Sequence, residues 1–375
     1  MQNSYISNIK KTGLNACEDA QSFLQSSMWG EFKSRFGWSA AAFLIDWTDG
    51  DKQETLPLLA LCRRLAPGIS FAYVPWGPEL PSFFTKDAKA QATAQLAEKL
   101  KTFLARNTAF IRFEPPWTEN MEQKTENKEQ RTENEDQSED SAAQEIAGRK
   151  LFLDAGFRRA AAVVQPPDTV IVDLSPSCGD ILAAMKPKWR YNVSLAVKKG
   201  VIVNVCTSQE LETFYTLLKE TAQRDGIAVH NYNYYKTLFE LCETYKGTQI
   251  RLYTASHEDD ALAAIVVLFR GKDAVYLYGA SSNIKRNLMA PYALQWKAMQ
   301  DAKETGCRHY DLFGIPPNDD PDHPMAGLYR FKTGFGGQIV HRPGSWDYAY
   351  KPFIYFLFKT AERIRKKLMD IRKKK

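Results

Sequence analysis

The chain has 375 residues, of which 44% are hydrophobic and 25% are charged, and its formal net charge is +6. This length is enough for two domains with cores of their own, and the composition is typical of a globular protein rather than a fibrous or membrane-spanning one. No apolar run approaches the roughly 20 residues that a membrane-spanning helix needs, and residues 1–11 lack the apolar core of a signal peptide, so we expect a cytoplasmic protein.

The first half of the chain contains a predicted strand–helix–strand unit. An apolar strand over 71–74 ends in Pro-Trp-Gly-Pro, a helix over about 88–106 follows, and a second strand over 110–113 runs into a double proline. Short apolar runs bounded by Gly and Pro are typical of strands. The unit therefore predicts an α/β domain in this half.

Residues 118–147 differ in composition from the rest of the chain. They hold ten acidic and three basic residues and almost no apolar ones. Such a segment cannot bury enough surface to offset the entropy lost on ordering. We predict a disordered acidic insertion, and the strongly basic remainder favours polyanionic partners.

The second half has helices and strands in a recognisable order. Helices are predicted over 187–199, 209–222 and 234–245, and a hairpin of strands 250–255 and 261–269 follows. Strand 274–278, helix 292–304 and strand 309–313 then repeat the first unit, again ending in a double proline. A strand–helix–strand order that recurs predicts two copies of one α/β unit.

Several common signatures are missing from the sequence. It has neither the GxGxxG nor the GxxxxGK[ST] phosphate loop, and no GxSxG motif. Acetyl-coenzyme A transferases of the N-acetyltransferase fold bind the pyrophosphate in a glycine-rich loop before a helix. The corresponding loop here, residues 281–287, has no glycine. The six cysteines lie far apart, with no CxxC pair and no histidine at metal-ligand spacing, which predicts free thiols and no metal site.

The chain resembles the Fem aminoacyltransferases, which add amino acids from aminoacyl-tRNA to the stem peptide of peptidoglycan precursors. The resemblance covers nearly the whole chain outside the acidic segment. Its motifs are residues 28–33 with 37–38, 188–192 with 198–200, 276–279 with 290–293, and 310–314 with 331–335.

The resemblance implies an α/β fold with mixed sheets, built as two tandem N-acetyltransferase-like (GNAT) lobes without the long helical arm of some members. We expect the first lobe over 1–164, with the insertion 118–147, and the second over 165–340, carrying most of the site. A segment over 341–375 is expected to return to the first lobe and end in a basic helix.

The resemblance also assigns residues to the reaction. An amine that attacks an ester carbonyl creates an oxyanion, which needs a positioned cation or donor. By resemblance Lys332 has that role and Phe331 packs beside it, on what the sequence suggests is a strand. Lys33 matches a phosphate-binding lysine, His230 stands where the best-understood member has arginine, and Tyr234 matches a substrate-contacting tyrosine.

Two further groups are candidate substrate-binding residues. Tyr276 and Tyr278 alternate with period two, so they are predicted to share one strand face and line a groove, although stacked core tyrosines would fit the same pattern. Lys188 and Arg190 belong to a basic cluster that could hold precursor phosphates or tRNA, or simply be solvated.

The predicted function is therefore transfer of an amino acid from aminoacyl-tRNA to a lipid-linked or UDP-linked muropeptide, with no other cofactor. A coenzyme A-dependent N-acyltransferase and a non-catalytic binder of cell-wall precursors or RNA are the alternatives.

Residues 351–375 carry ten bases among apolar residues. Such a helix either contacts the anionic inner face of the membrane or packs on the first lobe.

Overall fold

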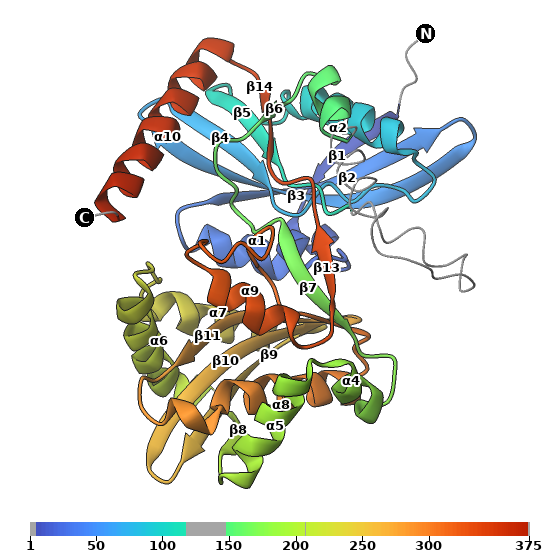
Figure 1. The fold of residues 1–375 in the computed structure, drawn as a ribbon. Coiled ribbons are helices and arrows are strands. Elements are labelled where there is room, and N and C mark those ends of the chain that lie inside the picture. The colour runs from blue at the N-terminus through green and yellow to red at the C-terminus, as the bar shows by residue number, and fades with distance from the viewer. Residues whose placement is uncertain (1–4, 118–147, 207, 374–375) are drawn as a thin grey trace. The chain divides into compact units, whose positions relative to one another are not determined.

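The computed structural model describes residues 5–117, 148–206 and 208–373, and side chains up to residue 364. The predicted insertion 118–147 lies outside these residues. The chain forms two compact units, Met1–Pro167 with His341–Lys375 and Asp168–Val340 (Figure 1). The boundary predicted at 164/165 and the one observed at Pro167 fall in the same connecting segment.

The first unit is a seven-stranded mixed sheet with helices packed on it. Its strands lie in the order β1-β2-β3-β4-β5-β14-β6. The strands are β1 (Ile6–Thr12), β2 (Ser39–Asp49), β3 (Lys52–Ala66), β4 (Ile69–Val74), β5 (Thr108–Phe113), β6 (Arg158–Arg159) and β14 (Trp346–Ala349). The main helices are α1 (Ser27–Ser34), α2 (Lys86–Leu100) and α10 (Pro352–Lys373).

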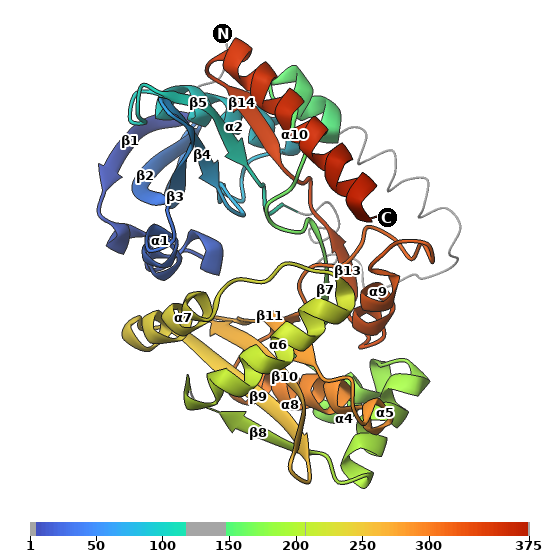
Figure 2. The same cartoon turned by 90° about the vertical axis from the view of Figure 1, so that its left-hand side faces the viewer.

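The second unit has a seven-stranded sheet of the order β13-β7-β12-β11-β10-β9-β8. The strands are β7 (Asp168–Asp173), β8 (Ile202–Cys206), β9 (Thr248–His257), β10 (Asp260–Arg270), β11 (Asp273–Ser281), β12 (His309–Asp311) and β13 (Gln338–His341). The helices are α4 (Cys178–Ala184), α5 (Pro187–Lys198), α6 (Leu211–Asp225), α7 (Tyr232–Thr244), α8 (Ala290–Glu304) and α9 (Ala326–Thr333). Helices α5 and α8 pack with the main core on one face of the sheet, and α6 and α7 cover the other (Figure 2).

The two sheets share one topology, which confirms the repeat predicted from the sequence. In each, a run of antiparallel strands ends in a parallel pair joined by a helix: β4–α2–β5 in the first unit and β11–α8–β12 in the second. A further strand then pairs antiparallel to the last one, β14 to β5 and β7 to β12. The predicted fold class of α/β mixed sheets in two tandem lobes is confirmed.

Local sequence explains most of the elements. The six residues of β5 and eight of the eleven of β10 are buried, as expected for central strands covered on both faces. Thr85 caps α2 and Asn231 caps α7 with side-chain oxygens, and α6 ends at Gly226 with φ of 63°, a left-handed conformation that glycine adopts without strain.

Two predictions about local structure were wrong. Phe331 and Lys332 lie on helix α9 and not on a strand. The alternation of aromatic residues at 329 and 331 imitates a strand, whereas the observed contact of Phe331 with Phe335, at a ring separation of 5.2 Å, has the i,i+4 spacing of a helix.

The prediction that Tyr276 and Tyr278 share one strand face was also wrong. Tyr276 pairs with Val267 and Tyr278 with the adjacent Val266, because β11 has an irregularity between them. Directly paired residues lie on the same face of a sheet, and consecutive residues lie on opposite faces. The bulge therefore turns the two tyrosines to opposite faces.

Candidate active site

The centre of the candidate site in the second unit is the point where β11 and β12 separate. Their parallel pairing ends at Val275 and Asp311, although β11 continues to Ser281. Beyond β12 the backbone turns through Phe313, whose φ is 58°. A left-handed conformation is uncommon for such a bulky residue. Phe313 and Gly314 follow in the chain just beyond the last β11–β12 pair.

Lys332 occupies this separation. Helix α9 presents its side chain, which is only 6% exposed, and Nζ donates hydrogen bonds to the carbonyl oxygens of Gly314 at 2.9 Å and Phe313 at 3.2 Å. Nζ also lies 5.2 Å from the ring centroid of Tyr276. The buried amine of Lys332 thus binds the backbone just beyond the end of the β11–β12 pairing.

Burial changes the acid–base chemistry of this amine. Desolvation lowers the pKa of Lys332 to about 7, and the carboxylate of Asp311 opposes the shift. Asp311 itself is held by the hydroxyl of Thr169 and by the backbone N–H of Phe313. Near neutral pH, Lys332 is therefore divided between a cation and a neutral amine, and in both forms its side chain is buried.

Tyr276 completes this group of side chains. Burial raises its pKa to about 12, so the phenol keeps its proton and remains a hydrogen-bond donor. A Cβ on Gly279, the next residue of β11 on the same face, would lie 1.8 Å from the Tyr276 oxygen. Only glycine leaves room for the hydroxyl there, which accounts for the Tyr-Leu-Tyr-Gly sequence of β11.

The motif around Trp189 fixes the position of α9. Trp189 Nε1 donates to the Phe331 carbonyl at 2.8 Å, and Lys186 N–H donates to the Gly334 carbonyl at 2.9 Å. A Cβ on Gly334 would lie 2.1 Å from the Trp189 ring. Phe331 itself packs against Tyr292, at a ring separation of 5.3 Å. These contacts join α5, α8 and α9 and so position Lys332.

The two basic candidates on α5 have different surroundings. Arg190 donates from Nη1 to the carbonyls of Ala183 and Met185, where helix α4 ends. These bonds satisfy orphan carbonyls of the helix end, which is a structural task. Lys188 is exposed to solvent.

Tyr278, Tyr234 and His230 form a second group, on the face covered by α7. The ring of Tyr278 lies 5.1 Å from that of Tyr235, and His230 stacks on Tyr234 at 3.7 Å. Burial raises the pKa of Tyr234 to about 12. The predicted residues of the second unit are thus divided between two faces of one sheet.

Lys33 belongs to the first unit. It lies on α1, with Nζ 5.6 Å from the ring centroid of Trp29 and 5.9 Å from that of Trp38. Burial and the nearby charge of Arg63 lower the pKa of Lys33 to about 8. The guanidinium of Arg63 also lies over Trp38, at 5.3 Å. Two cations on one indole form a site with the chemistry to accept an anion.

Sequence reasoning did not single out Asp311, Trp189 or Arg63 for these contacts. Asp311 follows two strand residues and is 6% exposed; a carboxylate inside an apolar strand was the signal that could have indicated it. The signal for Arg63 was weaker, because two adjacent arginines in a strand are usually solvated.

Comparison with known proteins agrees with the resemblance found in the sequence. Residues 15–258 and 246–363 match the model of the FemAB family. A lipid II:glycine glycyltransferase of Staphylococcus saprophyticus is 21% identical over 92% of this chain and 91% of its own length, and one of Staphylococcus aureus is 22% identical over 100% and 99%. The crystal structure of FemX superposes with a TM-score of 0.73 at 18% identity, covering 93% of this chain and all of that one. The chain belongs to the FemAB family.

Proposed function

We propose that this protein transfers an aminoacyl group from aminoacyl-tRNA to an amine on the stem peptide of a peptidoglycan precursor. The proposal is supported by the family, by relatives named lipid II:glycine glycyltransferase that align over nearly the full length of the chain, and by the buried amine of Lys332. These relatives favour glycine as the amino acid and a lipid-linked muropeptide as the acceptor. A tRNA donor would place the reaction in the cytoplasm.

The observation that carries the proposal is the buried amine of Lys332, which can carry a positive charge and already donates hydrogen bonds. The acceptor amine attacks the ester carbonyl, a C–N bond forms, and the carbonyl oxygen becomes an oxyanion. The ester C–O bond then breaks, and the proton lost by the amine goes to the leaving tRNA oxygen. Protonated Lys332, already aimed at two carbonyl oxygens, is suited to stabilise the oxyanion.

Acceptor binding would use the remaining candidates. The diphosphate of the precursor requires cations, which Lys33 and Arg63 can supply, while His230 offers a charge only when protonated. Tyr276 and Tyr278 remain candidate contacts, although from opposite faces of the sheet.

The experiment is a reconstituted transfer assay read by mass spectrometry. Purified protein, glycyl-tRNA and lipid-linked muropeptide should give a product heavier by one glycine residue, and ribonuclease treatment of the donor should abolish it. Lys332→Met should lower kcat by at least about a hundredfold, as expected for loss of one oxyanion donor. Lys272→Met, in the exposed turn between β10 and β11, is the matched control.

Two outcomes would contradict the proposal. Product formed from an acyl-coenzyme A without tRNA would favour the N-acyltransferase alternative. If muropeptides from cells with and without the gene have equal masses and the purified protein binds precursor without modifying it, the chain is a binding protein.

A further inference from the structure

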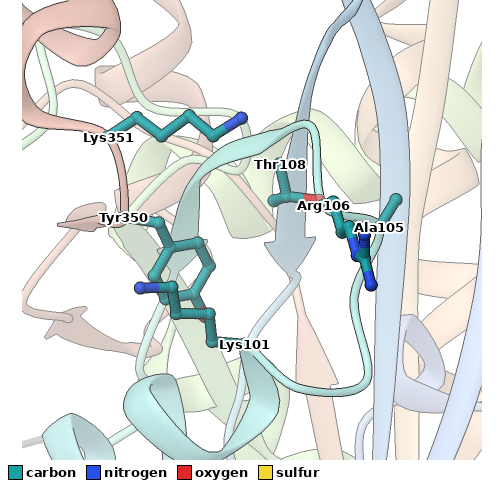
Figure 3. Close-up of a pocket in the computed structure, with 6 residues that line it drawn as sticks. All are labelled: Lys101, Ala105, Arg106, Thr108, Tyr350 and Lys351. Carbon is teal, nitrogen blue, oxygen red and sulfur yellow. The ribbon is translucent and has the colours of Figure 1, made fainter.

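A small basic pocket lies in the first unit, where β5 and α10 begin. Its cavity of about 260 Å³ is lined by three basic residues, a tyrosine and two small residues, namely Lys101, Arg106, Lys351, Tyr350, Ala105 and Thr108. None of the six is acidic. Figure 3 shows the Lys101 side chain beside the Tyr350 ring, with Lys351 and Arg106 at other sides of the pocket.

Hydrogen bonds hold the framework of the pocket. The backbone amides of Tyr350 and Lys351 both donate to the Ala109 carbonyl at 2.9 Å, and the Tyr350 hydroxyl donates to the Ala97 carbonyl at 2.6 Å. Lys101 Nζ lies 5.8 Å from the Tyr350 ring centroid. Three cations held around one cavity repel one another, and an anion in the cavity would relieve that repulsion.

Helix α10, which begins immediately after Lys351, presents a row of exposed apolar side chains. Exposed fractions are 75% for Phe353, 63% for Phe356, 51% for Leu357 and 55% for Ile364. At 3.6 residues per turn these four positions fall on one side of the helix.

The opposite side of α10 is packed on the sheet. Tyr355 is 1% exposed and donates to Asp347 at 3.0 Å, and Phe358 contacts the Phe110 ring at 4.9 Å. Helix α10 is therefore well packed on the sheet through one side, and the exposed apolar row is its outer face.

We propose that the pocket and the outer face of α10 form one docking surface for a membrane rich in anionic phospholipid. The pocket takes a headgroup phosphate, and Phe353 and Phe356 enter the interfacial layer beside it. An exposed aromatic row next to cations is the pattern of helices that lie on bilayers, and charge complementarity favours an anionic leaflet. The helix continues with Arg365, Lys366 and Lys367 in the sequence.

This inference extends the proposed function, since a lipid-linked acceptor is presented at a bilayer, but it does not depend on turnover. The described residues contain no helix long and apolar enough to cross a membrane. Contact at the surface is the mode that the pocket and the helix face support.

The test is vesicle binding by the full chain. Co-sedimentation is measured with vesicles of phosphatidylglycerol mixed with phosphatidylcholine, and with phosphatidylcholine alone. We expect binding only to the anionic vesicles. Lys101→Ala with Arg106→Ala should weaken it by about 25-fold, since each base near such a surface contributes about fivefold. Lys10→Ala with Lys52→Ala, exposed on β1 and β3, removes the same charge elsewhere and should weaken it much less.

A second variant examines the helix face. Phe353→Ser with Phe356→Ser leaves every charge in place and should also reduce binding to anionic vesicles at least tenfold. Thermal unfolding of each variant shows whether the first unit is intact.

Three results would overturn the inference. They are equal weakening by the two charge pairs, no binding of the wild type to anionic vesicles, and saturable binding of inorganic phosphate in the pocket that leaves vesicle binding unchanged. Failure of transfer with intact vesicle binding would instead count against the proposed function alone.

Discussion

Replacing Lys332 by methionine should make the protein more stable at neutral pH while removing its activity. The physical reason is that the lysine pays a desolvation cost in the folded state, where burial lowers its pKa from 10.5 to about 7. The unfolded chain therefore binds more protons than the folded one between these values. Stability attributable to this residue must then increase as the pH rises.

The magnitude follows from the difference in pKa. At pH 6, the folded state is destabilised by about 5 kcal/mol relative to a lysine with an unshifted pKa. Methionine removes that cost but also the bonds to the carbonyls of Phe313 and Gly314, worth about 1 kcal/mol each. The net expectation is a stabilisation of about 2–3 kcal/mol at pH 6.

The pH dependence makes this prediction specific. Between pH 7 and pH 9 the cost of burying Lys332 falls by about 2 kcal/mol, so the advantage of Lys332→Met should shrink by that amount. Denaturant unfolding of both proteins across this pH range measures the difference in free energy directly. Lys272→Met, at an exposed position, should show no such trend.

A stability difference between wild type and Lys332→Met that does not vary between pH 7 and pH 9 would refute the argument. It would mean that Lys332 is not desolvated in the folded protein, and the role assigned to its buried amine would lose its basis.

Three further predictions concern the site and its supports. Because Lys332 must be protonated to stabilise an oxyanion, kcat should fall about fivefold from pH 7 to pH 8, and Lys332→Arg should move this limb of the pH–rate profile to higher pH. Gly334→Ala should destabilise the protein by about 2–3 kcal/mol, measured by denaturant unfolding, because the new Cβ would lie 2.1 Å from the Trp189 ring. Arg63→Ala should raise KM for the precursor about tenfold with little effect on kcat, measured by initial rates, if Arg63 and Lys33 share the acceptor's phosphates.

The Gly334 and Arg63 predictions each have a control in the same element. Gly327→Ala, also in α9 but with nothing within 4 Å of the new Cβ, should be neutral or slightly stabilising; equal destabilisation by both glycine variants would contradict the role of Trp189. Arg64 points to the other face of β3 from Arg63. An equal increase of KM in Arg64→Ala would mean that overall positive charge, and not a specific contact of Arg63 with phosphate, sets the affinity for the precursor. If the pH–rate profile of Lys332→Arg equals that of the wild type, the group that titrates is not Lys332.

The overall architecture was predictable from the sequence because its signals are local. Strand 110–113 and strand 309–313 are apolar runs, each preceded by a helix-length segment and followed by a double proline. In each unit the second strand of the repeat pairs parallel to the first, so the repeated sequence order gave two equivalent parallel pairs.

The site depended on contacts that no local pattern contains. Alternation placed Tyr276 and Tyr278 on one face, but a single irregularity in the pairing with β10 separated them. The sequence around Lys332 identified the residue without showing that it is buried. That burial requires β12 to diverge from β11. It also requires the hydrogen bond from Trp189 to the Phe331 carbonyl of α9, two residues that are 142 positions apart in the sequence.

The sequence by itself indicated the two-lobed α/β architecture through its repeated strand–helix–strand order, and its resemblance to the Fem aminoacyltransferases singled out the candidate lysines. Only the tertiary structure decided that Lys332 has a pKa near neutrality and that α10 keeps an apolar face exposed. Desolvation depends on which distant segments cover a side chain, and this is a property of the folded chain alone.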